Sequence, residues 1–256
     1  NGMSNGRGLD IISSWTKSFQ SGKYFKVQGM IKRVGDFEAP DYLLSNTGND
    51  ENNISFSLGQ NKILSHWKIN FSFFNQEIGI LRSAHIGNVY DLVTAIELDN
   101  PSIINPFSHQ VISPKQDNKH YTAGVQYSKR NQSNGKWTAQ YSWQKNNRKE
   151  YDVRRGQYNN KAAIDLTLDT HNLTTNYKWD GSKWSFDTGA FLQVQDNYSN
   201  PYTGIKRLIP DYIKTRLGTY FTASLSPSND FSLGFGFRYG HQNNQVKKYY
   251  HNSRWR

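Results

Sequence analysis

The sequence contains no cysteine among its 256 residues, which excludes a disulfide scaffold and any zinc site built on thiolates. It also lacks any run approaching the roughly 20 consecutive apolar residues of a membrane-spanning helix, so a helical membrane protein is excluded. The first ten residues have neither the charged nor the apolar region of a secretory signal peptide. No His-Glu-x-x-His motif for a catalytic metal occurs.

What the chain has is aromatic and polar residues in close mixture. Aromatic residues make up 14% of it and hydrophobic residues 35%, which is enough to fold, yet the mean hydropathy is only -0.82. The net charge of +11 fits a nucleic-acid binder, a surface against anionic lipid or a pore for anionic ligands. Because Lys and Arg are scattered without the stripe or run that phosphate-backbone binding usually shows, we expect no nucleic acid as a partner.

Apolar residues recur at every second position, which is the period of a two-faced β-strand. In the segment 136–144, Trp137, Ala139, Tyr141 and Trp143 alternate with Lys, Thr, Gln and Ser. In the segment 164–177 the alternation slips between Leu168 and Leu173, which predicts a bulge or the point where a strand leaves the membrane. Alternation of this kind predicts about ten strands, near residues 9–19, 25–31, 54–58, 67–73, 121–127, 136–144, 164–177, 184–195, 217–225 and 231–239.

The connections between these strands are short and long in turn. The short ones cover 20–22, 60–62, 131–135, 180–183 and 226–230, and the long ones lie near 35–52, 76–119, 145–162 and 196–214. Outer-membrane barrels have this asymmetry, with tight periplasmic turns and long extracellular loops, whereas a soluble sandwich has no physical reason for it. We therefore predict an all-β protein, an antiparallel transmembrane β-barrel in the bacterial outer membrane, with membrane lipid as a partner and Trp and Tyr near strand ends at the lipid headgroups.

Four segments between the strands resemble stretches of TonB-dependent receptors, of the kind common in Bacteroidetes-like bacteria. They are 83–88 followed by Asp91-Leu92, 146–156, 195–197 and 207–212, and the similarity spans about 22–239. The resemblance implies active uptake of a scarce nutrient, such as an iron chelate (a siderophore), cobalamin, a glycan or a peptide. It implies a receptor and not an enzyme, with no resident cofactor. The uptake would be driven through the TonB energy-transducing complex.

The chain departs from this family in size. The resemblance implies a 22-strand barrel that surrounds a globular plug domain, whereas this chain begins directly in a strand and has about ten. Its last residues, 252–256, are not the aromatic-terminated final strand of such barrels. We therefore expect residues 1–256 to be one partial barrel domain without its plug, whose further partners are that plug and the remaining strands.

The candidate ligand-binding residues lie in three long connections. Continued alternation directs Arg148, Glu150, Asp152 and Arg154 inward over the pore mouth, where they either pair to hold the wall or contact a ligand. An amphipathic helix is expected over 88–97, covering the mouth. The full set of candidates is Arg148, Glu150, Asp152, Arg154, Arg155, Asp196, Asn197, Tyr198, Arg207, Asp211, Tyr212 and His85.

Three other functional classes remain open at this point. An independent small barrel of ten strands could be a porin. A hydrolase at the rim of such a barrel could use Asp169 to orient His171 as a general base, although no nucleophile motif stands beside them. A soluble β-sandwich that binds carbohydrate could also alternate in hydrophobicity. No metal site is expected in any of them.

Overall fold

The computed structural model describes residues 1–256 apart from 85–87, 155–160, 229 and 248–256, and it is almost entirely one antiparallel sheet. Ten long strands follow one another, as the alternation predicts. The short β1 (Gly2–Met3) precedes them at one edge. The ten are β2 (Gly8–Ser18), β3 (Lys23–Val34), β6 (Asn49–Asn61), β7 (Ser65–Gly79), β8 (Lys115–Arg130), β9 (Gly135–Tyr151), β10 (Ile164–Asp180), β11 (Trp184–Ser199), β12 (Asp211–Ser228) and β13 (Phe231–Lys247).

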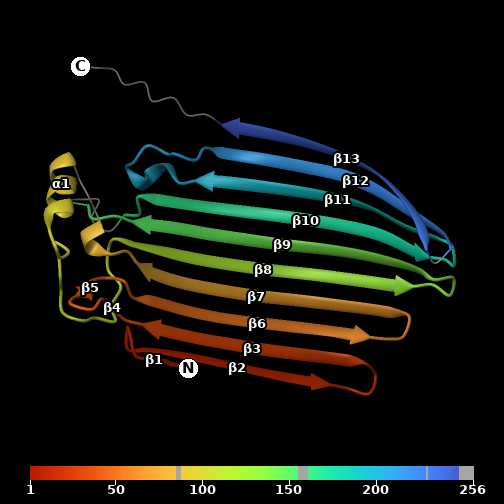
Figure 1. Ribbon diagram of the computed structural model, residues 1–256, viewed down its shortest axis with the longest axis horizontal. Helices are drawn as coiled ribbons and strands as arrows, with labels where there is room; N and C mark the ends of the chain where they lie inside the picture. The colour runs from red at the N-terminus through yellow and green to blue at the C-terminus, as the bar shows by residue number, and fades with distance from the viewer. Residues whose placement is uncertain (85–87, 155–160, 229, 248–256) are drawn as a thin grey trace.

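Each strand pairs with the next along the chain, so the sheet is a simple meander from β1 to β13. Figure 1 shows that the five tight turns between the long strands lie at one end of the sheet, whereas the long connections lie at the other, together with the short turn between β1 and β2. The segregation of connections that the sequence predicts is therefore confirmed. The described strands form an open sheet with β1–β2 and β13 at its two edges, so they do not close into a ten-stranded barrel.

The strands run further toward the long-loop end than the sequence indicates. The predicted loops 35–52, 76–119, 145–162 and 196–214 shrink to 35–48, 80–114, 152–163 and 200–210. The added strand ends, such as Asn49 to Asn52 and Lys145 to Glu150, are polar on both faces, so hydrophobic alternation cannot mark them. Backbone pairing continues there because it does not depend on which side chains the strand carries.

The register places most of the aromatic and branched side chains of the ten strands on one face. Across the middle of the sheet, Phe71, Ala123, Trp143, His171 and Val194 lie in one row from β7 to β11. Nothing in the described chain covers this face, and its large side chains stay exposed, as the 60% of Trp15 and 57% of Phe235 illustrate. A soluble sandwich would bury this face against a second sheet, so that alternative is wrong for the described residues.

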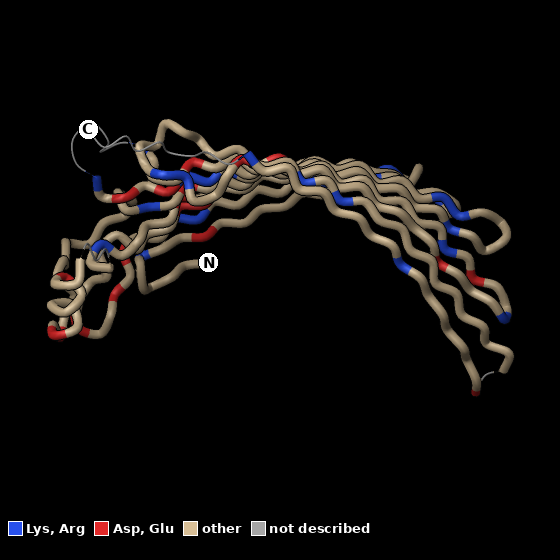
Figure 2. The backbone as a smooth tube through the Cα atoms, turned by 90° about the horizontal axis from the view of Figure 1, so that it is seen from above, with Lys and Arg blue, Asp and Glu red and all other residues tan. Residues whose placement is uncertain are grey.

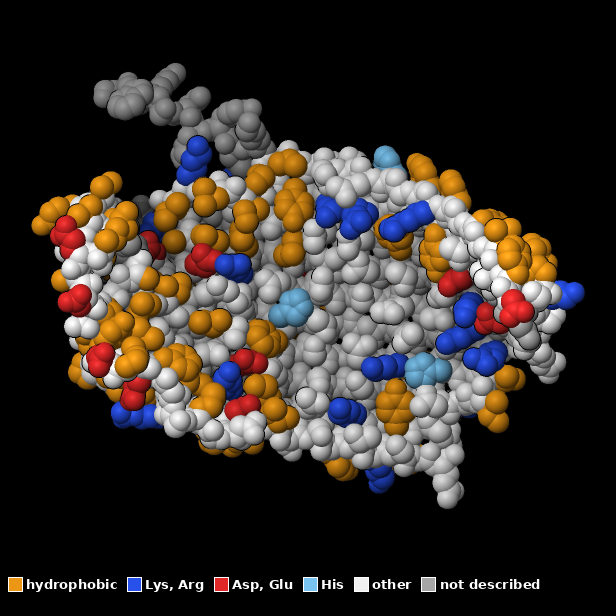
Figure 3. Space-filling view, in the orientation of Figure 1, with side chains coloured by type: hydrophobic (Ala, Val, Ile, Leu, Met, Phe, Trp, Pro, Cys, Tyr) orange, Lys and Arg blue, Asp and Glu red, His pale blue; other side chains and the backbone are white. Residues whose placement is uncertain are grey.

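The opposite face is polar and is the hollow side of an arched sheet. Figure 2 shows the arch, with the long connections folded beneath it at one end. The middle of the face seen in Figure 3 carries few hydrophobic side chains, whereas they gather around its rim. Among the helices described, none combines the length and apolarity needed to cross a bilayer.

The long connections pack over the end of β3 and form the small core of the molecule. Val34 is only 1% exposed, and Val111 from the 80–114 connection is also buried. The backbone of Gly35 lies so close to Phe107 that a Cβ at Gly35 would come within 2.5 Å of the ring. Asn46 joins the same two connections, because its Nδ2 donates to the carbonyl oxygens of Ile80 at 2.9 Å and Pro114 at 2.7 Å.

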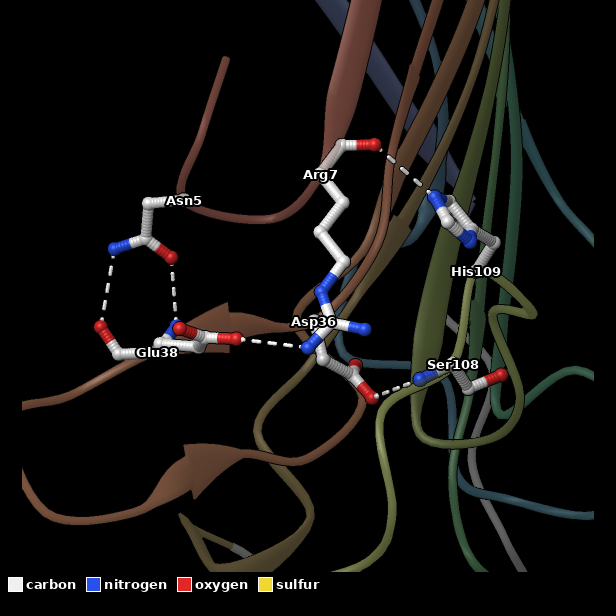
Figure 4. A network of polar contacts seen from close by, with 6 residues as sticks. All are labelled: Asn5, Arg7, Asp36, Glu38, Ser108 and His109. Atoms are coloured by element: carbon white, nitrogen blue, oxygen red, sulfur yellow. Dashed lines mark hydrogen bonds and ion pairs between the residues drawn. The ribbon is translucent and has the colours of Figure 1, made fainter.

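A buried carboxylate completes this junction (Figure 4). The side chain of Asp36 accepts the backbone N–H of Thr47 at 3.1 Å and that of Ser108 at 3.1 Å, and the residue is 3% exposed. At the surface beside it, Arg7 forms an ion pair with Glu38 at 3.3 Å, and its guanidinium lies 4.1 Å from the centre of the Phe107 ring. The first hairpin, the ribbon of β4 (Phe37–Glu38) and β5 (Leu43–Leu44), and the 80–114 connection are thereby held together.

The helix predicted over 88–97 is present as α1 (Val89–Glu97), preceded by the short turn η1 (Arg82–Ala84). Asn88 caps it, because its side chain accepts the N–H of Asp91 at 2.9 Å. The expected packing over the mouth is wrong, since no residue of α1 is buried and Val89 is 76% exposed. The reason is position, because α1 lies beyond the ends of the strands (Figure 1).

Candidate functional site

A cavity of about 560 Å³ lies at the long-loop end of β9, β10 and β11. The connection 200–210 forms one side of it, through residues 205–209, and Ile80, Ala84 and Pro114 contribute from the 80–114 connection. From the polar face the strands contribute Arg148, Glu150, Ile164, Leu166 and Ser199, and Tyr151 and Asp165 at the strand ends also line the cavity. This mouth cavity has a volume in the range of small-molecule sites and a largely apolar lining with charged groups at a few points.

The slip in alternation along 164–177 has its explanation here. β10 pairs with β9 and β11 without any shift of register, so the predicted bulge is wrong. The side chains of Ile164, Leu166 and Leu168 instead lie on the polar face, while Leu173 lies on the apolar face. Apolar residues therefore change faces where the strand passes from the apolar band to the mouth cavity, and Ile164 and Leu166 line that cavity.

Four of the residues predicted on 148–154 lie at or near the mouth cavity. Arg148 and Glu150 share the polar face of β9 and form an ion pair with each other, and Asp152 lines the cavity beyond the strand end. Arg154 reaches across to the 200–210 connection, where its Nη1 donates to the carbonyl oxygen of Thr203 at 2.7 Å. Arg155 lies outside the described residues.

The 200–210 connection is held in place by polar contacts at both of its ends. Arg207 donates to the carbonyl oxygen of Ser199 at 3.0 Å and lies 3.6 Å from a carboxylate oxygen of Asp211, and both side chains are mostly buried. Asp211 in turn accepts the N–H of Ser199 at 2.7 Å. Asn197, 4% exposed, donates to the carbonyl oxygen of Pro210 at 3.0 Å. Arg207, Asp211 and Asn197 therefore position this wall of the cavity.

Two predicted ligand contacts lie on the wrong side of the sheet. Asp196 and Tyr198 are opposite Asp169 and Thr167, on the apolar face and away from the cavity, because 196–199 is still strand and neighbouring residues point to opposite faces. Tyr212 does lie on the polar face, where its hydroxyl donates to Gln195 at 3.3 Å. His85 lies outside the described residues.

The Asp169–His171 pair considered for a hydrolase is formed, but on the apolar face. His171 Nε2 lies 3.2 Å from Asp169 Oδ1, Tyr141 lies 2.7 Å from His171 Nδ1, and Trp143 donates to Asp169 at 2.8 Å. The segment Gly2-Met3-Ser4-Asn5-Gly6 fits the Gly-x-Ser-x-Gly spacing. It forms the turn between β1 and β2, seven strands from β10 in the sheet, and no helix follows it. The serine of this segment therefore does not lie beside the pair.

Comparison with known proteins identifies the fold. No family model and no curated protein matches the sequence. Among the solved structures that match the fold across nearly the whole chain are three transporters and receptors. They are the ferric citrate transporter FecA in unliganded form (10% identity, TM-score 0.60), the copper transporter OprC (9%, 0.57) and the siderophore receptor PiuA from Acinetobacter baumannii (10%, 0.52). The chain shares its fold with these transporters and receptors.

The match covers 93–95% of this chain in the same comparisons, which also include FpvAI in complex with pyocin S2. It covers only 36–45% of the other chains. The chain therefore spans well under half the length of the proteins whose fold it shares, and its ten strands correspond to one part of their sheet.

Proposed function

We propose that the chain is the early part of the barrel of a TonB-dependent receptor, which takes up a scarce nutrient across the bacterial outer membrane. The observation that carries the proposal is the combination of an uncovered apolar face, a polar hollow face and a cavity enclosed by connections gathered at one end. Contact with lipid requires the apolar face, and a water-filled passage requires the polar face. Capture of a ligand from outside the cell requires the cavity.

The remaining parts follow from the same proposal. The two open edges of the sheet would pair with further strands of a 22-strand barrel, because a sheet in lipid cannot leave backbone groups unpaired. A plug domain would fill the hollow, and the TonB complex would act through that plug. The nutrient would be an iron chelate, cobalamin, a glycan or a peptide, and the mouth cavity would be where it first binds.

The test is growth and uptake in a strain from which the gene has been deleted. Complementation should restore growth on one limiting source among iron chelates, cobalamin, glycans and peptides, and the uptake should stop when a protonophore collapses the inner-membrane gradient. Uptake that continues without the gradient would favour a porin. A chain that stays soluble without detergent would contradict a membrane location.

A double substitution addresses the mouth cavity itself. Arg148→Gln with Glu150→Gln removes both charges of the ion pair that lines the cavity and leaves the net charge unchanged. We expect initial uptake at limiting nutrient to fall about tenfold, which corresponds to the loss of about 1.4 kcal/mol of ligand binding. Lys136→Gln, on the same face of the same strand but at the turn end, is the matched control and should have little effect.

A further inference from the structure

Three basic side chains form a column on the polar face of the last two strands. Lys214 and Arg216 lie on β12, and Arg238 lies on β13 opposite Tyr220. All three face away from the apolar side chains of Leu217 and Phe221 on the intervening positions. The strand rise places Lys214 and Arg216 about 7 Å apart and Arg238 about 14 Å further toward the turn end.

None of the three pairs with a carboxylate of the described chain. Two cations at the mouth cavity do, since Arg148 pairs with Glu150 and Arg207 with Asp211. A carboxylate on the polar face of the neighbouring strand, Asp187, accepts the hydroxyl of Tyr220 at 2.9 Å. The column is therefore a run of like charges without internal neutralisation, and repulsion between them favours a negatively charged occupant.

The side chains around the column are amides and hydroxyls, which suit an oxygen-rich molecule. In the register, Arg216 lies between Gln193 and Gln242, and Lys214 lies between Gln195 and Asn244. Amides of this kind both donate and accept hydrogen bonds. They leave the charge of the column unchanged while offering partners to hydroxyl or carboxylate oxygens.

The lower end of the column opens on a second cavity, of about 430 Å³. On the polar face it is lined by Thr174, Asn176, Phe191, Tyr220 and Arg238. Gly218 and Gly240 pair directly with each other between Arg216 and Arg238, and neither has a side chain to fill this space. The Phe191 ring packs over Gly218. Thr174 is eight residues below Leu166 of the mouth cavity on β10, about 27 Å along the strand.

We propose that Lys214, Arg216 and Arg238 form a binding path for an anionic, oxygen-rich ligand, such as a polycarboxylate chelate or an acidic sugar, and that the path leads from the mouth cavity to the cavity at Arg238. This inference rests on the proposed uptake function and narrows its substrate to anions. The guanidinium of Arg238 binds a carboxylate of the ligand, while Phe191 and Tyr220 contact its apolar part.

The test measures binding of three probes to the complete receptor that contains this chain, purified in neutral detergent micelles: citrate as the anion, maltotriose as the neutral molecule and spermidine as the cation. At about 20 mM salt, where screening is weak, citrate should bind at least about tenfold more tightly than either of the others. The triple variant Lys214→Gln, Arg216→Gln, Arg238→Gln should weaken citrate binding about tenfold, and raising the salt to about 300 mM should weaken binding to the unsubstituted receptor.

The matched control removes three positive charges from the other face of the sheet. Lys119→Gln, Lys145→Gln, Lys149→Gln changes the net charge equally, and these residues share the outward face of β8 and β9. This control should retain citrate binding. A second variant, Arg216→Lys with Arg238→Lys, keeps the charges and should also retain it within about threefold, so that loss of binding in the Gln variant is not mistaken for misfolding.

Equal binding of maltotriose and citrate would overturn the proposal, as would equal losses in the two triple variants. If Lys214, Arg216 and Arg238 instead bind an acidic segment of a plug domain, the Gln variant should bind citrate as tightly as the unsubstituted protein. This result would also overturn the proposal. The proposed uptake function fails separately, when the complemented deletion strain shows no gradient-dependent uptake. Gradient-dependent uptake that the Gln variant supports at the full rate would leave that function standing and reject the anion path.

Discussion

Replacing Asp36 with alanine should open the junction between the 35–48 and 80–114 connections. Its carboxylate accepts two backbone N–H groups, from Thr47 and Ser108, both at 3.1 Å and in a buried setting. Hydrogen bonds to a charged group contribute about 1.5–3 kcal/mol each, and a buried donor left without a partner costs a similar amount. With partial relaxation and water entry, we expect a loss of about 3 kcal/mol of local stability.

Hydrogen exchange measures this loss directly, because the two amides report on opening of the junction. A loss of about 3 kcal/mol corresponds to about a hundredfold faster exchange at Thr47 and Ser108, while amides in the middle of β9 and β10 should be unaffected. Asp36→Asn keeps one of the two acceptor oxygens, so the exchange rates of its two amides should lie between those of the wild type and those of Asp36→Ala. Glu38→Ala, which removes an exposed ion pair with Arg7, should cost less than about 1 kcal/mol. Unchanged exchange at both amides in Asp36→Ala would refute the view that this carboxylate holds the connections together.

Three further substitutions test other parts of the molecule. Arg207→Ala removes the contacts to Ser199 and Asp211 and should speed proteinase K cleavage within 200–210 about tenfold. The control Lys206→Ala should leave the cleavage rate unchanged, and equal cleavage rates in the two variants would contradict the positioning role of Arg207. Gly79→Ala would place a Cβ 2.3 Å from the backbone oxygen of Asn46 and should cost at least about 2 kcal/mol in urea unfolding, whereas Gly240→Ala, whose nearest atom is 4.0 Å away, should cost less than about 1 kcal/mol. Leu192→Lys on the apolar face should lower folding stability in lipid bilayers by about 2–4 kcal/mol, and Gln193→Lys on the polar face by less than about 1 kcal/mol; similar losses would argue that the apolar face does not meet lipid.

The sequence by itself determined the ten strands, the face of each that is apolar and the end at which the long connections gather. These features follow from local rules, because a period of two in hydrophobicity is a property of single strands and the length of a connection is read directly from the chain. The helix over 89–97 was predictable for the same reason, with Asn88 as a recognisable cap. Alternation also predicted that Arg148 and Glu150 share one face of a single strand, although it left open whether they pair with each other or contact a ligand.

Only the tertiary structure decided what the loop ends do. Strand pairing continues through polar residues that carry no periodic signal, which moved Asp196 and Tyr198 to the apolar face and turned the 196–214 prediction into a shorter connection. The phase slip at Leu168 is visible in the sequence, but its cause, a cavity built by residues some 40 positions away in the chain, is not. Likewise Arg216 and Arg238 share one column only through the pairing of β12 with β13. Register and burial depend on contacts between distant segments, and a single sequence does not record which segments meet.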